Sequence, residues 1–328
     1  MKNTPSSTNF SAAGPQSRPT APTTISAALS QVHVGAAQSF RNFAVFPLVA
    51  TGRQPVAFIT LDEALDRYVA VVTEVSEGGV VPELRFENKG DVPVLLLDGE
   101  ELVGARQNRV LNLTILVSAR STLVIPVSCV EAGRWSYNSR HFGSAKRAMY
   151  ASARASKMEQ VSASLRESGA RRSDQSAIWD DISSKSTRFG TRSPTVAMSD
   201  IYADAAPRVE EYTNAVGNVP GQVGAVFAVN QEVVGLELFE SEEIYQKLMA
   251  KLLSSYAIEA VDGHSENTRA VALDDARDFL RRILTASFAS FKALGEGEDL
   301  RLHGDGVVGG ALVVDDHVIH ISAFKDSR

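Results

Sequence analysis

The sequence predicts an α+β protein with a β-rich N-terminal lobe, a helical connector, and a C-terminal antiparallel sheet covered by two helices. Three observations support this class. Residues 32–135 contain short apolar and β-branched runs separated by turn signals, residues 136–215 change to helical spacing, and two similar hairpins flank two helical patterns in the last third. The 328 residues, 44% of them hydrophobic, are enough to bury a substantial core.

The N-terminal lobe is expected to be a sandwich or a partly closed barrel. Residues 1–31 are rich in Ser, Thr, Pro and Ala, and we expect them to form a disordered tail. The strands and one short helix of the lobe are expected at residues 44–49, 61–68 (the helix), 68–75, 92–97, 110–117 and 122–130.

The connector at 136–215 is basic, although the whole chain carries a net charge of −6. Between residues 140 and 192 there are eleven Lys and Arg against five Asp and Glu. Arg147, Arg154 and Lys157 fall on a different helical face from the apolar Ala151 and Met158. We interpret this as a solvated helical face, with a nucleic-acid contact or the positive rim of a pocket as alternatives.

The last region, residues 216–328, is predicted to form one antiparallel sheet with two helices on one of its faces. Ser241 is a suitable N-cap for a helix from 242 onward, and a second helix is expected over 273–294. Segments 223–239 and 308–324 align at an offset of 85 residues and are both typical of hairpins.

Composition restricts the partners and the location. The acidic balance argues against non-specific nucleic-acid binding, and the longest apolar runs fall far short of the ~20 residues that cross a bilayer. The N-terminus lacks an apolar export signal, and Cys129 is the single cysteine. We therefore expect a cytoplasmic protein without a membrane partner.

Charged residues interrupt the core pattern of two predicted strands. Arg109 shares strand parity with Leu111, and Glu131 shares parity with Val127 and Cys129, so both point toward an apolar face. Because an isolated buried charge is very costly, each needs a partner. Arg109 and Glu131 are therefore expected to lie in the same lobe and to share a site.

Other polar residues complete this predicted site. Glu100 and Glu101 face opposite ways on a strand, and the parity of the preceding residues favours Glu101 as a member. We assign acid–base or hydroxyl-binding roles to Glu101 and Glu131. The residues predicted to bind the ligand are Gln107, Asn108, Arg109, Arg134 and Trp135.

Two interpretations of this cluster stay open. In the first, Arg109 and Arg134 face an anion and Trp135 stacks on a ring, as in a ligand pocket. In the second, the cluster is a buried salt-bridge network that fixes strand register. No nucleotide-binding glycine motif and no metal-ligand spacing is present, so the sequence assigns neither a cofactor nor a metal.

The same residues carry a resemblance to a known family. Segments 97–109 (LDGEELVGARQNR) and 126–135 (PVSCVEAGRW) resemble the ARG and rhodanese-phosphatase-superfamily-associated protein domain, as do 175–179 and 253–260. The family is catalogued largely as a domain of unknown function. Its name implies a context of ADP-ribose or NAD-derived metabolites, in bacterial conflict systems, and it implies no particular reaction.

Two functions follow as expectations. The first is an enzyme or sensor that binds or hydrolyses a nucleotide-like anion related to ADP-ribose or NAD. The second is a non-catalytic module that binds a protein partner, in which the Arg/Glu network is structural.

Overall fold

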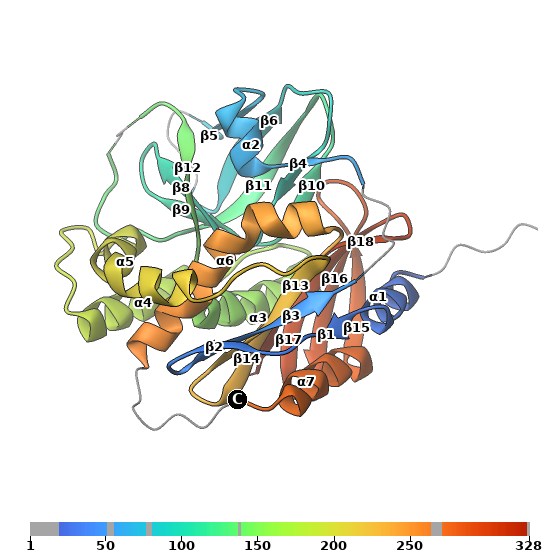
Figure 1. Ribbon diagram of the computed structural model, residues 1–328. Coiled ribbons are helices and arrows are strands. Elements are labelled where there is room, and N and C mark those ends of the chain that lie inside the picture. Colours follow the sequence, from blue (N-terminus) through green and yellow to red (C-terminus); the bar gives the residue numbers. More distant parts are fainter. Residues whose placement is uncertain (1–19, 51–55, 77–80, 137–138, 264–270, 327–328) are drawn as a thin grey trace, which may run out of the picture.

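The computed structural model describes residues 20–50, 56–76, 81–136, 139–263 and 271–326. It confirms the α+β class: a closed barrel and a large antiparallel sheet are joined by helices (Figure 1). Within the described residues, every helix is too short or too polar to cross a membrane.

The large sheet has nine described strands in the order β1-β3-β13-β14-β18-β17-β16-β15, with β2 also paired to β3. The two predicted hairpins are its centre, and they meet where β14 pairs with β18. Its strands are β1 (His33–Val34), β2 (Gln38–Phe40), β3 (Phe43–Val49), β13 (Gln222–Val229), β14 (Glu232–Phe239), β15 (Ser287–Lys292), β16 (Glu298–Gly304), β17 (Val307–Val314) and β18 (His317–Lys325).

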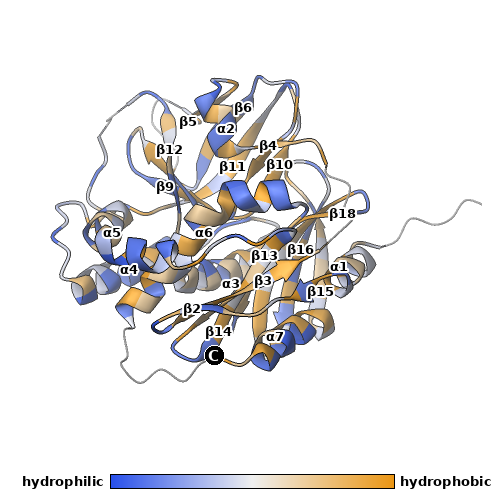
Figure 2. Cartoon of the chain, in the orientation of Figure 1, coloured by the Kyte–Doolittle hydropathy of each residue, from blue (hydrophilic) through white to orange (hydrophobic). Residues whose placement is uncertain are grey.

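The two C-terminal helices cover opposite faces of this sheet, and the expectation of one shared face is wrong. Helix α6 (Glu242–Asp262) packs with Phe227 in one hydrophobic cluster, whereas α7 (Leu273–Thr285) packs with Val226 in another. Since successive residues of β13 point to opposite faces, both faces need a cover. Figure 2 shows hydrophilic and hydrophobic residues along α7, whose buried side contains Phe279 and Ile283.

Two local predictions also differ from the structure. The predicted helix 273–294 ends at Thr285, and residues 287–292 form the edge strand β15, because β16 supplies hydrogen-bond partners for that backbone. Residues 21–30 of the predicted tail form helix α1 (Ala21–Ser30), whose Ile25 and Leu29 are buried against the α7 face. The four-residue spacing of these apolar side chains explains the helix. Residues 1–19 lie outside the described part.

The β-rich lobe contains a closed barrel in the order β11-β6-β5-β12-β8-β9 and a small sheet β10-β7-β4. The barrel strands are β5 (Ala70–Glu74), β6 (Glu83–Asn88), β8 (Glu100–Gly104), β9 (Arg109–Leu111), β11 (Ser121–Cys129) and β12 (Phe142–Ala148). The small sheet has β4 (Ile59–Thr60), β7 (Val94–Leu96) and β10 (Ile115–Val117). Helix α2 (Leu61–Asp66) begins at a capping box of Thr60 and Glu63.

Strand pairing does not follow the predicted division at residues 32–135 and 136–215. Strands β1, β2 and β3 join the large sheet, and β12 joins the barrel. The physical reason lies in β3, where Phe43 and Val45 enter one hydrophobic cluster and Ala44 and Phe46 the other. A strand that is apolar on both sides suits the interior of a sheet covered on both faces.

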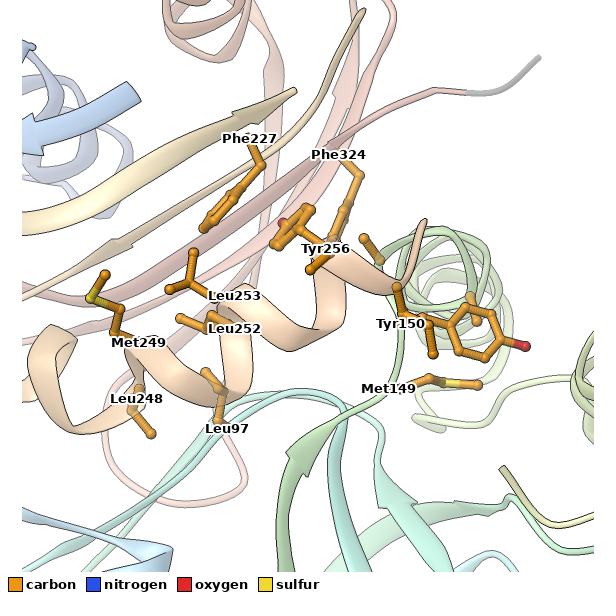
Figure 3. Packing of buried hydrophobic residues seen from close by; sticks show 14 of the residues in the cluster. Leu97, Met149, Tyr150, Phe227, Leu248, Met249, Leu252, Leu253, Tyr256 and Phe324 are labelled. Atoms are coloured by element: carbon orange, nitrogen blue, oxygen red, sulfur yellow. The ribbon is translucent and has the colours of Figure 1, made fainter. Parts of the chain in front are cut away.

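Three connector helices lie between the barrel and the large sheet: α3 (Ala151–Ser168), α4 (Gln175–Phe189) and α5 (Met198–Asn214). Helix α3 contacts β17 and β18, α4 contacts β11, and α6 contacts both β12 and β13. One hydrophobic cluster therefore joins the two parts, and Figure 3 shows a portion of it. The labelled residues come from the loop after β7 (Leu97), the link between β12 and α3 (Met149, Tyr150), α6 (Leu248, Met249, Leu252, Leu253, Tyr256) and the sheet (Phe227, Phe324).

Candidate functional site

Arg109 points into one end of the barrel. It opens β9, and its ladder partners are Leu102 on β8 and Cys129 on β11. Leu102 and Leu111 belong to the hydrophobic core of the barrel. Because side chains alternate along a strand, Arg109 lies on the same interior face, as strand parity predicts. Its exposed fraction is 0%.

One nitrogen of the Arg109 guanidinium is hydrogen bonded. Nη1 donates to Oε1 of Gln107 at 3.1 Å and to the carbonyl oxygen of Asn108 at 3.5 Å. Nε and Nη2 are shielded from solvent and have no hydrogen-bond partner within the described chain. Burial lowers the pKa of Arg109, and the nearby carboxylate of Glu74 offsets part of this effect. A cation is therefore held in the barrel without a full set of acceptors.

Gln107 links Arg109 to Glu131. Its Oε1 accepts the bond from Arg109 and a second bond from Sγ of Cys129 at 3.2 Å, while its Nε2 donates to the carbonyl oxygen of Glu131 at 2.9 Å. Arg109 and Glu131 therefore lie in one cluster, joined through Gln107 rather than by a direct salt bridge.

Glu131 is saturated by donors. Its Oε1 accepts from Nε of Arg134 and from Oγ1 of Thr195, both at 2.9 Å. Its Oε2 accepts from Nη2 of Arg134 at 2.7 Å and from the backbone N–H of Asn108 at 3.1 Å. Burial acts to raise the pKa of Glu131, but these hydrogen bonds outweigh it and lower the pKa. Glu131 is thus an anchoring carboxylate with no free oxygen lone pair aimed at Arg109.

Arg134 holds the segment after β11 in place with all five of its N–H groups. Besides the two bonds to Glu131, Nη1 donates to the carbonyl oxygens of Ala105 and Ser136, and Nη2 donates to Oδ1 of Asn108. Neither Arg134 nor the side-chain oxygen of Asn108 is therefore unpartnered. Both residues position the loops that close this end of the barrel.

Trp135 lies beside the buried cation at the protein surface. The Arg109 Cζ atom is 5.8 Å from the centroid of its ring, and the Arg106 Cζ atom is 5.4 Å away. The indole is 45% exposed. It combines a flat apolar surface with a contact to the interior cation.

Glu101 lies on the opposite face of β8 from the Arg109 cluster. Its ladder partner is Val110, whereas Arg109 is paired with Leu102. Its fully buried carboxylate is 3.2 Å from Nε of Arg147, without hydrogen-bond geometry. Burial raises the pKa of Glu101 to about 7; Arg147 opposes the rise, and Glu131 and Asp200 add to it. The structure therefore does not place Glu101 with Arg109.

Glu74 is a further charged residue of the barrel interior that the predicted site does not include. It ends β5 and shares a strand face with Ala70 and Val72, which belong to the barrel core. Both of its carboxylate oxygens are shielded from solvent and have no hydrogen-bond partner in the described structure. The signal was available, because the same parity rule that selected Arg109 places Glu74 inward after two apolar residues.

The arrangement can bind an acceptor group. Nε and Nη2 lie on one edge of the guanidinium plane, the edge that donates two parallel hydrogen bonds to a carboxylate or a phosphate. The described residues contain no group of three or more His, Cys, Asp or Glu side chains placed to hold a metal ion.

These features define an α+β protein in which a six-stranded barrel carries a buried arginine at one end and is joined by helices to a larger sheet. The chain belongs to the ARG and Rhodanese-Phosphatase-superfamily-associated Protein domain family, whose profile matches residues 31–324. The resemblance inferred from the motifs is therefore confirmed. No curated protein and no solved structure gives a significant match.

Proposed function

We propose that the protein binds a small nucleotide-like anion at the barrel end, with Arg109 holding its phosphate group. The observation that carries the proposal is the free Nε/Nη2 edge of a guanidinium that is 0% exposed. More than nine in ten buried polar groups in proteins are hydrogen bonded, so a partnerless buried edge with this geometry requires an explanation. A bound oxyanion supplies one.

The surrounding residues suit a binding role. Gln107 and Asn108 fix the orientation of Arg109, while Arg134 and Glu131 fix the adjoining loops. The exposed surface of Trp135 offers a base a place to stack next to the phosphate subsite.

Binding is better supported than hydrolysis. Glu131 has a lowered pKa and donors on both oxygens, and Glu101 faces away from Arg109. Neither is placed to activate water at the free edge of Arg109. The more specific link to ADP-ribose or NAD, and to bacterial conflict systems and a cytoplasmic location, rests on the family description and on composition, and is part of the proposal.

The test compares wild type with Arg109→Met and with the matched control Arg85→Met, which removes an exposed arginine from the outer side of the same barrel. Thermal unfolding and calorimetry would be measured with ADP-ribose, NAD, AMP and inorganic phosphate. A ligand at about 100 times its Kd should add about 2.7 kcal/mol to the unfolding free energy and raise Tm by several degrees. We expect this shift in wild type and Arg85→Met, and its loss in Arg109→Met.

The alternative function is a protein-interaction module with a structural Arg/Glu network. It is favoured by one observation: Gln107, Glu131 and Arg134 are fully paired with one another and with the backbone. If none of the four ligands shifts the wild-type transition, while Arg109→Met unfolds at a much lower temperature, the binding proposal is wrong and this alternative is retained.

A further inference from the structure

The barrel holds a second side chain with unsatisfied polar atoms, and its charge acts on Arg109. Glu74 has two shielded oxygens without hydrogen-bond partners, and Arg109 has two shielded nitrogens without them. We infer that Glu74 is the second half of the site, and that the ligand whose phosphate Arg109 holds carries vicinal hydroxyl groups, as a ribose phosphate does. This inference rests on the proposed function and specifies its ligand.

The topology places the two groups on opposite walls. Around the closed order β11-β6-β5-β12-β8-β9, strands β5 and β9 are three positions apart in either direction. Glu74 on β5 and Arg109 on β9 both point inward, and their charges are close enough for Glu74 to oppose the lowering of the Arg109 pKa. Within the described residues, neither group is hydrogen bonded to the other. The two groups therefore lie on different strands of the barrel wall.

The chemistry of the two groups is complementary. A guanidinium donates only, and an ionised carboxylate accepts only. A single ligand therefore supplies hydrogen-bond partners to both groups when it presents acceptors at one end and hydroxyl donors at the other. A phosphate fits the edge of Arg109, and two neighbouring hydroxyls fit the two oxygens of Glu74.

Local charge favours a hydroxylated phosphate as the ligand over a zwitterion such as an amino acid. The described charged groups near Arg109 include the guanidinium groups of Arg106 and Arg134 and the carboxylates of Glu74 and Glu131. An ammonium group bound at Glu74 would add a further positive charge opposite these guanidinium groups, whereas a hydroxyl adds none.

The experiment measures calorimetric Kd values for inorganic phosphate, ribose 5-phosphate, 2-deoxyribose 5-phosphate and glycine. The proteins are wild type, Glu74→Gln and Glu87→Gln, the last removing a half-exposed carboxylate from the outer side of β6. In wild type and Glu87→Gln we expect ribose 5-phosphate to bind at least about tenfold more tightly than the deoxy sugar, the effect of one hydrogen bond to a charged acceptor. In Glu74→Gln the ratio of the Kd values for the two sugar phosphates should fall to about one. The Kd for inorganic phosphate should stay within about twofold of the wild-type value.

The outcomes separate the two proposals. If wild type binds phosphate through Arg109 but does not distinguish the two sugars, Glu74 is not a hydroxyl subsite and the proposed function survives. If glycine binds more tightly than ribose 5-phosphate and Glu74→Gln abolishes this, the ligand is a zwitterion and the inference is overturned. If no phosphate binds to wild type, both proposals fall. The two sugar phosphates are compared on wild type, so the result does not depend on the folding of a variant.

Discussion

Two fully buried arginines in this protein have opposite surroundings. Arg154 on α3 donates from Nε to Asp98 at 3.2 Å, from Nη1 to Glu237 at 2.6 Å and from Nη2 to Ser322 at 3.3 Å. Arg109 contacts no carboxylate and keeps one edge unpartnered. Both residues are 0% exposed.

The neighbourhood of Arg154 extends this contrast. Lys157 donates to Asp98, and Glu237 also accepts from Tyr256 at 2.9 Å and contacts Nε2 of His320 at 2.8 Å. Burial acts to lower the pKa of Arg154, but Glu237 and Asp98 outweigh it and raise the pKa, whereas the pKa of Arg109 is lowered. Burial of a charge therefore does not define its role. Arg154 is paired directly with carboxylates, whereas the proposed ligand site rests on the unpaired edge of Arg109.

The largest expected effect is that of Arg154→Met. It leaves Asp98 and Glu237 buried with less compensation, which should cost about 3–5 kcal/mol of unfolding free energy. Urea denaturation at neutral pH would measure this, with Arg85→Met as the control that should stay within about 0.5 kcal/mol of wild type. A loss below about 1 kcal/mol would show that the ion network does not hold the barrel to the sheet.

Glu101→Gln should change the pH dependence of stability. The native state holds the Glu101 proton up to about pH 7, whereas the unfolded chain releases it near the ordinary value of 4.5. Between these values the native state binds more protons, so the unfolding free energy of wild type falls as pH rises. The unfolding free energy of Glu101→Gln does not fall in this way, because glutamine does not titrate. Its stability relative to wild type should increase by on the order of 3 kcal/mol between about pH 4 and pH 8.

Denaturation curves of both proteins at four or five pH values in this window would measure that difference. A constant difference between wild type and Glu101→Gln would mean that Glu101 is ionised in the native state throughout, with Arg147 as a sufficient partner.

The smallest expected change in stability is that of Arg109→Met. Without ligand, removal of a buried cation that lacks an ion-pair partner should leave the unfolding free energy within about 1 kcal/mol of wild type, or raise it. Urea denaturation of the ligand-free proteins would measure the difference in unfolding free energy between wild type and Arg109→Met. A loss of about 3 kcal/mol or more would make Arg109 equivalent to Arg154, and the comparison between the two regions would fail.

The basic connector shows where sequence reasoning reached its limit. The helical spacing predicts a solvated face for Arg154 and Lys157, but both are fully buried, and Lys157 also donates to the carbonyl oxygen of Leu111 at 2.9 Å. Their acceptors Asp98 and Glu237 lie 56 and 83 residues from Arg154 along the chain. Helical spacing identifies a face of a helix, but it does not say what that face meets.

The local properties of this protein follow from residues that are close together in the chain. The alternation of side chains along β9 placed Arg109 with Leu111 inside a core, and the paired hairpins with the N-cap at Ser241 predicted the centre of the large sheet and the start of α6. These properties depend on backbone geometry within a few residues.

Which side chains contact one another depends on how the distant segments of the chain pack together. It joined β3 to the distant β13, turned Glu101 away from Arg109, and set Glu74 on the opposite wall of the barrel. Sheet closure and helix packing bring together residues far apart in the chain, and strand parity gives the face of a side chain but not its partner. For that reason only the fold shows that Arg154 contacts carboxylates directly and that Arg109 does not.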